Sequence, residues 1–264
     1  MDLQLSGKLA LVTGSTAGIG FAIAKGLAAE GARLVVNGRT EARVAAACDA
    51  LRREHPSAEL EAFVADLSRA EAAQSACERF PNLQILVNNL GTYETKPFEQ
   101  ISDADWHTII ETNFMSGVRL SCYWLPRMKA AGWGRIIFIS SESAVNIPLE
   151  MIHYGVTKTM QVALARGLAE TTSGTGVTVN SILAGPTRSE GVEGFVQGMA
   201  RAKQVTTAEI EKEFFRSVRP SSIIQRFATP DEVAALTVFV ASPLSSATNG
   251  AALRVDGGVV RSIL

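Results

Sequence analysis

The chain has 264 residues, of which 47% are hydrophobic and 19% charged, and this composition excludes an intrinsically disordered protein. Its 25 basic and 26 acidic residues leave a formal net charge of −1, which argues against a nucleic-acid-binding protein and against a polybasic membrane anchor. A chain of this length and composition favours a single α/β domain over residues 1–264.

Cysteines and histidines are few and widely spaced. The three cysteines form no C-x-x-C pair, and the three histidines show no metal-ligand spacing with them, so we expect reduced thiols and no metal site. The first residues lack a basic segment followed by a long apolar run, so no secretory signal is expected. No apolar run approaches the about 18 residues that span a bilayer, and together these features predict a cytoplasmic protein without a membrane partner.

Seven short apolar runs alternate with helical patterns along the chain. The predicted strands cover residues 9–12, 33–37, 61–65, 84–88, 135–139, 177–182 and 251–255. The predicted helices cover residues 19–30, 41–54, from about 69, from 102 or 103 to 129, 153–172 and 231–241, with Gly31 closing the first. Because the strands are apolar on both faces, we predict a parallel sheet covered by helices, either closed as a barrel or open and doubly wound.

Residues 185–229 have the weakest sheet pattern. They contain scattered glycines, two weak helical patterns and a charged run at 209–213. We predict a helical insertion at about 186–229, between the sixth strand and the last helix. It is either a solvated flap or a lid over a substrate.

A glycine-rich turn follows the first predicted strand. Glycines let the chain turn tightly and let backbone N–H groups approach a phosphate, to which the following helix adds positive potential. In this strand–turn–helix context the turn predicts a Rossmann-type, doubly wound fold that binds a dinucleotide. No Gly-Lys-Ser/Thr sequence closes the turn, so a nucleotide-hydrolase phosphate loop is excluded. The expected cofactor-binding residues of this turn are Gly14, Ser15, Thr16, Gly18, Ile19 and Gly20.

The end of the second predicted strand indicates which dinucleotide is bound. A fold that selects NAD places Asp or Glu there, about 20 residues beyond the turn, to bind the ribose 2′-hydroxyl. This chain has Gly38 and Arg39 instead. Glycine leaves room for a 2′-phosphate and the guanidinium can bind it through two N–H groups, so we expect NADP(H). The alternative is that Arg39 is a solvated loop charge.

Tyr154 and Lys158 are four residues apart on a predicted helix, so they share one face. A free phenol has a pKa near 10, and a neighbouring ammonium lowers it by stabilising the phenolate. Ser141 precedes Tyr154 by 13 residues and follows the fifth strand, at the carboxyl edge where ligands bind in open sheets. The three side chains form a candidate acid/base site.

These motifs, in this order over essentially the whole chain, resemble the short-chain dehydrogenase/reductase family, in a single-domain branch that includes 3-oxoacyl-(acyl carrier protein) reductases. The glycine-rich turn at 13–20, the Asn-Asn-Leu-Gly segment at 88–91 and the Val-Asp-Gly-Gly segment at 255–258 are similar to family motifs. The segment 184–186 reads Ala-Gly-Pro, whereas the family usually has Pro-Gly there. By resemblance, further cofactor contacts are expected from Asp66, Leu67, Asn89, Gly91, Tyr154, Lys158, Gly185, Pro186 and Thr187, with Ser189 as an alternative to Thr187.

The resemblance implies an NADP(H)-dependent oxidoreductase that transfers hydride between nicotinamide and a small-molecule ketone or secondary alcohol. It implies that Tyr154 exchanges the substrate proton and that Ser141 binds the substrate oxygen. It further implies that Lys158 lowers the tyrosine pKa and binds ribose, while Asn113 holds a water that connects Lys158 to solvent. A homodimer or homotetramer is also implied.

Two other functions stay open. One is reduction of a 3-oxoacyl thioester, with the acidic carrier protein docked on Arg127, Lys129 and Arg135. The other is a non-catalytic protein that binds or senses NADP(H), because fold alone does not determine function.

The substrate pocket is expected to be mostly apolar. Its predicted walls are Tyr93, the segment 144–148, Phe195 and Met199. Two neighbours of the candidate site are ambiguous. Glu142 either contacts a polar substrate or turns into solvent, and His153, one residue before the tyrosine, is expected to pack or to line the pocket rim.

Overall fold

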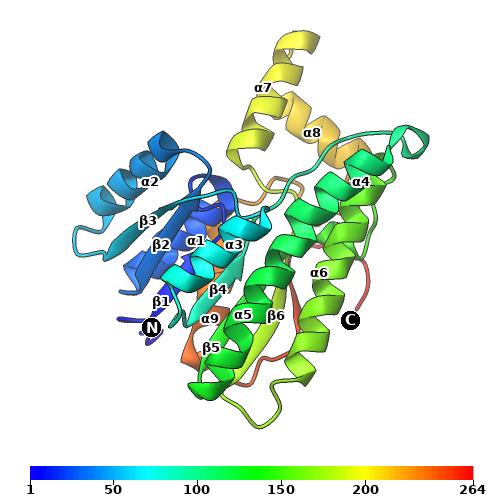
Figure 1. The fold of residues 1–264 in the computed structure, drawn as a ribbon. Coiled ribbons are helices and arrows are strands. Elements are labelled where there is room, and N and C mark those ends of the chain that lie inside the picture. The colour runs from blue at the N-terminus through cyan, green and yellow to red at the C-terminus, as the bar shows by residue number, and fades with distance from the viewer. Residues whose placement is uncertain (264) are drawn as a thin grey trace.

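A computed structural model describes residues 1–263, and its centre is one open parallel sheet (Figure 1). The strand order is β3-β2-β1-β4-β5-β6-β7, with every neighbouring pair parallel. The strands are β1 (Leu9–Val12), β2 (Arg33–Gly38), β3 (Leu60–Val64), β4 (Ile85–Asn88), β5 (Gly134–Ser141), β6 (Val177–Ala184) and β7 (Ala252–Val255). The predicted doubly wound sheet is confirmed and the barrel alternative is wrong. The order reverses between β1 and β4, where ligands bind in such sheets.

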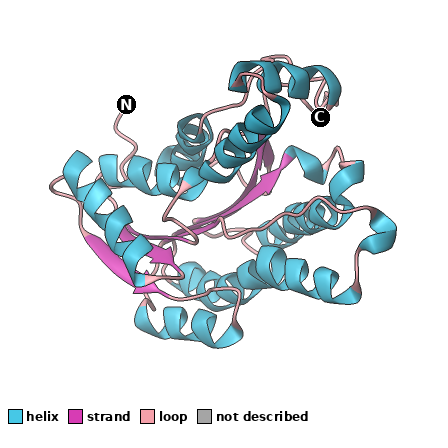
Figure 2. Cartoon of the chain, turned by 90° about the horizontal axis from the view of Figure 1, so that it is seen from above, coloured by secondary structure: helices cyan, strands magenta, loops and turns pink. Residues whose placement is uncertain are grey.

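Helices cover both faces of the sheet, as the view from above shows (Figure 2). They are α1 (Gly18–Ala29), α2 (Glu41–Glu54), α3 (Ala70–Arg79), α4 (Asp103–Ile110), α5 (Ser116–Ala130), α6 (Ile152–Glu170), α7 (Glu190–Lys203), α8 (Thr207–Ser217) and α9 (Pro230–Ala241). Residues of α1, α2 and α9 form one buried cluster with the strands, and residues of α3, α5 and α6 form another. The three-layer arrangement therefore buries both faces of the sheet.

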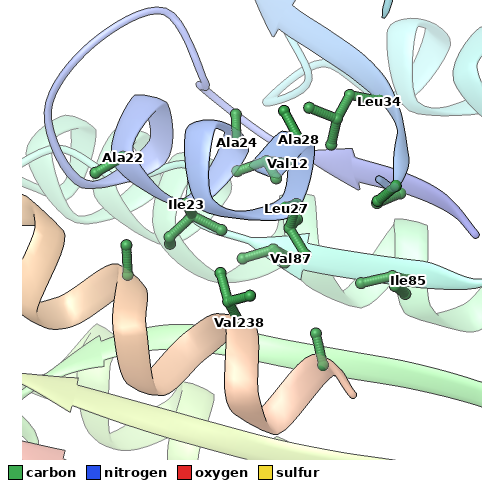
Figure 3. Packing of buried hydrophobic residues seen from close by; sticks show 14 of the residues in the cluster. Val12, Ala22, Ile23, Ala24, Leu27, Ala28, Leu34, Ile85, Val87 and Val238 are labelled. Atoms are coloured by element: carbon green, nitrogen blue, oxygen red, sulfur yellow. The ribbon is translucent and has the colours of Figure 1, made fainter. Parts of the chain in front are cut away.

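Close packing of α1 against α9 holds the first turn in place (Figure 3). Ile23 and Leu27 of α1 are fully buried in the cluster that contains Val238 of α9. A Cβ atom at Gly26 would lie 2.8 Å from Cγ2 of Val238, so the close approach of the two helices requires glycine there. Truncation of such a buried leucine to alanine costs about 3 kcal/mol, from the lost apolar burial and the cavity left behind.

Helix boundaries follow recognisable signals. The chain leaves α1 through Gly31, whose φ of +77° favours glycine. Of the two predicted N-caps for α4 the structure uses Ser102, which forms a reciprocal capping box with Asp105.

The prediction of one continuous α-helix from 102 or 103 to 129 is wrong. A π-helical turn, Glu111–Met115, separates α4 from α5 and contains Asn113. A π-turn shifts the helix register by one residue and frees main-chain groups, and such turns are frequent at functional sites.

The insertion between β6 and α9 forms two helices, α7 and α8, which extend beyond the carboxyl edge of the sheet (Figure 1). A separate small apolar cluster that includes Val196, Phe215 and Phe227 holds them together. No helix within residues 1–263 is long and apolar enough to cross a membrane.

Candidate active site

The glycine-rich turn joins β1 to α1 at the carboxyl edge of the sheet. Gly14 and Gly18 have φ values of +64° and +56°, which favour glycine. A Cβ atom at Gly20 would lie 2.4 Å from the carbonyl oxygen of Gly14, so the turn closes only with glycine there. The glycines thus let the backbone N–H groups at the amino end of α1 be approached closely, which fits a pyrophosphate.

Asn37 and Ser15 tie this turn to β2. The Gly14 N–H donates to Oδ1 of Asn37, and the Asn37 N–H donates to Oγ of Ser15 at 2.9 Å. Both side chains are buried. The Ser15 hydroxyl therefore supports the turn from inside, whereas Thr16 is partly exposed.

Gly38 ends β2 beside the turn, with Arg39 exposed immediately after it. A Cβ atom at Gly38 would lie 2.5 Å from Cγ2 of Thr16. A side chain at this position would displace the Thr16 side chain, and glycine itself offers no carboxylate to a ribose 2′-hydroxyl. The charged side chain next to this position is the exposed Arg39 guanidinium.

Asp66 and Leu67 follow β3 at the same edge. Asp66 accepts hydrogen bonds from the N–H and the hydroxyl of Ser68. Burial raises the pKa of Asp66, but these hydrogen bonds and the nearby charges of Arg39 and Arg69 outweigh burial and lower it. The Leu67 side chain is buried in the core, so only its backbone is available to a ligand.

Two further segments complete the predicted nucleotide surface. Nδ2 of Asn89 donates to the carbonyls of Thr13 and Gly14, and this fixes the loop that contains Gly91. After β6, a Cβ atom at Gly185 would lie 2.6 Å from Cα of Asp256. The glycine is required there by the neighbouring loop, and Pro186 follows it without disturbing the turn.

The hydroxyls of Thr187 and Ser189, the two candidates for a carboxamide contact, both form hydrogen bonds with the protein's own backbone. Oγ1 of Thr187 donates to the carbonyl of Gly185 at 2.9 Å, and Oγ of Ser189 caps α7 by accepting from the N–H of Val192. Both residues line the main cavity, so the choice between them stays a prediction.

Ser141, Tyr154 and Lys158 line that same cavity, which has a volume of about 540 Å³. Ser141 ends β5, and Tyr154 and Lys158 lie on α6, whose first turns pack against the short helical turn after β5. Nζ of Lys158 lies 5.6 Å from the centroid of the Tyr154 ring and donates to the carbonyl of Ile139. The three side chains that the sequence placed in one acid/base site are therefore neighbours.

The pKa values of Tyr154 and Lys158 differ from what the sequence led us to expect. Burial raises the pKa of Tyr154 to about 12, a hydrogen bond with Ser141 opposes the increase, and the charge of Glu142 adds to it. Burial lowers the pKa of Lys158 to about 8. The expected lowering of the phenol pKa is therefore wrong for the protein alone, because the cost of burying a phenolate exceeds the opposing effects of the Ser141 hydrogen bond and the Arg219 charge.

Asn113 lies in the π-turn and fixes the loop that contains Gly91. Its Oδ1 accepts from the N–H of Thr92 at 2.7 Å, and its Nδ2 donates to the carbonyl of the same residue. Its main-chain carbonyl accepts from Nε2 of Gln161, whose Oε1 accepts from Nζ of Lys158. The sequence did not indicate Gln161, although its position three residues after Lys158 places it on the same helix face.

The cavity walls agree only in part with the prediction. Tyr93, Phe195 and Met199 line the cavity, but the segment 144–148 does not. That segment turns outward after the short helical turn Glu142–Ala144, and Val145 and Ile147 are exposed. The residues that line the wall there are Glu142, Ser143, Glu150 and Met151.

Glu142 and His153 are both buried, at 3% and 1% exposure. The solvent-facing alternative for Glu142 is wrong, because Nε of Arg219 donates to its Oε1 at 2.9 Å. The sequence did not predict this contact with Arg219, which lies near the end of the insertion, because no local pattern pairs two residues that are 77 positions apart. His153 packs edge-on against Trp106 at a centroid distance of 6.0 Å, so its packing role is confirmed.

The prediction that Arg135 belongs to a carrier-protein dock is wrong, because this residue is buried, with 1% of its surface exposed. Its guanidinium donates to the carbonyls of Gly134, Gly176 and Ser242 and lies over Trp133. It supports the amino end of β5, far along the strand from Ser141.

The chain is similar to known proteins over nearly its whole length. Residues 14–260 match the family described as enoyl-(acyl carrier protein) reductase. The chain is 47% identical over 263 residues to the uncharacterized oxidoreductase YvaG of Bacillus subtilis, and it is 35% identical to D-beta-hydroxybutyrate dehydrogenase of Cupriavidus necator. These matches cover 100% and 97% of this chain, and 100% and 99% of the relatives.

A solved structure shows the same fold over the whole length. L-sorbose reductase from Gluconobacter frateurii, complexed with NADPH and L-sorbose, superposes with a TM-score of 0.94 at 29% identity, covering 100% of each chain. The fold and site define an oxidoreductase that acts on CH–OH or C=O groups. The chain belongs to the short-chain dehydrogenase/reductase family.

Proposed function

We propose that this protein is an NADP(H)-dependent oxidoreductase that interconverts a ketone and a secondary alcohol, with Tyr154 as the general acid/base. The observation that carries the proposal is the placement of Ser141, Tyr154 and Lys158 on one wall of the cavity, beside the glycine-rich turn. An acid, an oxygen-binding hydroxyl and a cation in one cleft form the set that carbonyl reduction needs.

The proposed cofactor surface combines the glycine-rich backbone of the first turn with a few polar and charged side chains. The turn at 13–20 would hold the pyrophosphate, Asp66 the adenine and Arg39 the 2′-phosphate. Lys158 would bind the nicotinamide ribose, and Thr187 the carboxamide. When bound, the cofactor supplies hydride to the carbonyl carbon or accepts it from the carbinol.

The side chains of the chain itself handle the proton and the substrate oxygen. With its pKa raised to about 12, the Tyr154 phenol is protonated at neutral pH and is ready to donate to the carbonyl oxygen. The Ser141 hydroxyl donates a second hydrogen bond to that oxygen and stabilises its developing charge. In the oxidation direction the phenol must lose its proton first, and the Lys158 ammonium favours that loss.

Choice of cofactor rests on the end of β2. Because Gly38 has no side chain, the usual carboxylate that selects NAD is absent there, and the Thr16 side chain occupies the adjoining space. The sorbose reductase, which shares this fold, was solved in complex with NADPH, and this supports the same choice. We also propose that α7 and α8 form a lid over the substrate, since Phe195 and Phe214 line the cavity, and that the chain forms a homodimer or homotetramer.

The substrates named for relatives differ in charge. One relative acts on D-beta-hydroxybutyrate, a carboxylate, and another on L-sorbose, a neutral sugar. Reduction of carrier-bound 3-oxoacyl thioesters is less favoured, because Arg135 is buried and only Arg127 and Lys129 of the proposed dock are accessible.

The experiment is reduction of a panel of ketones, diketones and 3-oxoacyl thioesters by the purified protein, followed by the absorbance of reduced nicotinamide. We expect oxidation of NADPH with at least one ketone, and slower reaction with NADH. Tight NADPH binding without reaction on any carbonyl compound would favour the sensing protein instead.

A further inference from the structure

The cavity wall beside Ser141 carries a buried carboxylate that the acid/base set does not use. Glu142 is fixed through Oε1 by Arg219, but its Oε2 has no hydrogen-bond partner within residues 1–263. An unpaired carboxylate oxygen in a buried place is unfavourable, because it has lost its water and gained no donor. Burial raises the pKa of Glu142, and Arg219 and the neighbouring Ser143 hydroxyl oppose the increase, but Ser143 does not give Oε2 a hydrogen bond of normal geometry. A ligand can supply that bond.

Arg219 is already neutralised and cannot attract an anionic substrate. Besides Glu142, its guanidinium donates to Oε1 of Glu150 at 3.3 Å and to the carbonyl of Val218 at 3.0 Å. Two carboxylates thus surround one cation, and the cluster carries one excess negative charge.

Apart from this cluster, the charged residues that line the cavity are Glu213 and Lys158. Glu213 is paired with Nζ of Lys203 at 2.8 Å, so the excess negative charge lies in the Arg219 cluster. The Glu142 charge also acts on the Tyr154 phenol, so the carboxylate and the reacting position share one electrostatic environment. A second carboxylate brought in by a substrate meets repulsion here, which is strong in a site shielded from water.

We propose that Glu142 determines substrate specificity, with Oε2 accepting a hydrogen bond from a substrate hydroxyl, so that the substrate is a neutral hydroxyketone or the corresponding polyol and not a keto acid. This inference rests on the proposed function, since it names the substrate class of the same reaction. A methyl group in the same place would leave Oε2 unpaired, and a site built to bind a hydroxyl rejects such an analogue strongly.

Three small ketones test this directly, because they differ only at one end. They are 4-hydroxy-2-butanone, 2-pentanone, in which a methyl group replaces the hydroxyl, and acetoacetate, in which a carboxylate replaces the hydroxymethyl group. With NADPH, we expect kcat/KM for the hydroxyketone to exceed each of the other two by about 10- to 100-fold, the range for a hydrogen bond to a buried charge.

Two variants locate the effect. Glu142→Gln presents an amide in place of the free acceptor, and we expect the preference for 4-hydroxy-2-butanone over 2-pentanone to fall by about tenfold. Glu150→Gln is the matched control: it removes the same charge from the same arginine but leaves Oε2 of Glu142 in place. We expect Glu150→Gln to retain most of the preference for 4-hydroxy-2-butanone over 2-pentanone.

The outcomes separate the two proposals. No reaction of the wild-type protein with any ketone overturns the proposed function, and the specificity inference with it. Reaction with equal or better use of acetoacetate overturns the inference alone, as does an unchanged preference in Glu142→Gln. If Glu142→Gln does not fold, the wild-type comparison of the three ketones decides by itself.

Discussion

The main-chain carbonyl oxygen of Asn113 lies 2.6 Å from Nε2 of Gln161, which donates a hydrogen bond to it. Through Oε1 the same glutamine accepts from Nζ of Lys158 at 3.2 Å. The π-turn at Glu111–Met115 carries Asn113 toward α6 at this point. The Gln161 side chain therefore connects the main chain of Asn113 to the ammonium of Lys158.

Replacement of Gln161 by leucine tests whether this connection positions Lys158. We expect Gln161→Leu to lower kcat by about tenfold, because Lys158 and the Asn113 carbonyl each lose a buried partner. An ammonium without its acceptor is less favoured, so activity should also decline at a lower pH than in the wild-type protein. The measurement is kcat against pH.

Gln161→Glu is the matched control, since it keeps an oxygen for Lys158. It should restore the upper limit of the pH profile toward that of the wild-type protein. A glutamine that serves only packing would instead give reduced thermal stability with the pH profile of both variants unshifted.

Tyr154→Phe tests the acid/base assignment. Loss of the phenol proton should lower kcat/KM for any accepted ketone by about 1,000-fold, within the range for removal of a general acid. NADPH affinity should stay nearly unchanged, which fluorescence titration measures. Tyr93→Phe removes a second phenol whose ring lies 6.1 Å from that of Tyr154, and it should retain activity. Substantial turnover by Tyr154→Phe would remove this tyrosine from the chemistry.

The strands and the cofactor turn were predictable because they depend on local patterns. Fully apolar runs give parallel strands, and a turn such as 13–20 requires glycine for reasons that involve its own backbone. Ser141, Tyr154 and Lys158 also follow from spacing, because one lies at a strand end and the others are one helical turn apart.

Contacts between distant segments were not predictable. Arg219 and Glu142 are 77 residues apart, and only the path of the insertion brings them together. The burial of Arg135 likewise depends on carbonyls from three different segments. The π-turn at Asn113 has no local signal, since a helical pattern does not reveal an added residue.

Arg39→Ala tests the choice between NADP and NAD. Without the guanidinium, the Kd for NADPH should rise by about 10- to 100-fold, the range for a charge-assisted pair, while the Kd for NADH changes little. Arg33→Ala is the control: it removes an exposed arginine from the other end of β2, where it pairs with Glu59. Equal weakening of both nucleotides in Arg39→Ala would show that this residue does not recognise the 2′-phosphate.

Lys158 makes a prediction about stability. Its folded-state pKa of about 8 lies below the ordinary value of 10.5, so the unfolded chain binds more protons between these two values. The Lys158 contribution to the free energy of unfolding should therefore rise with pH from about 8 toward 10, by at most about 1.4 kcal/mol per pH unit. Below pH 8 both states carry the charge, and the cost of burying it is constant.

Lys158→Met isolates this contribution. Other groups change protonation in the same range, but they do so in both proteins and cancel in the difference between their unfolding free energies. Urea unfolding at several pH values from 7 to 10 measures that difference. We expect Lys158→Met to be the more stable protein at pH 7, because it buries no charge, and to lose that advantage steadily above pH 8. A difference that stays flat across this range would mean that the ammonium keeps an ordinary pKa in the folded protein and is not destabilised by its burial.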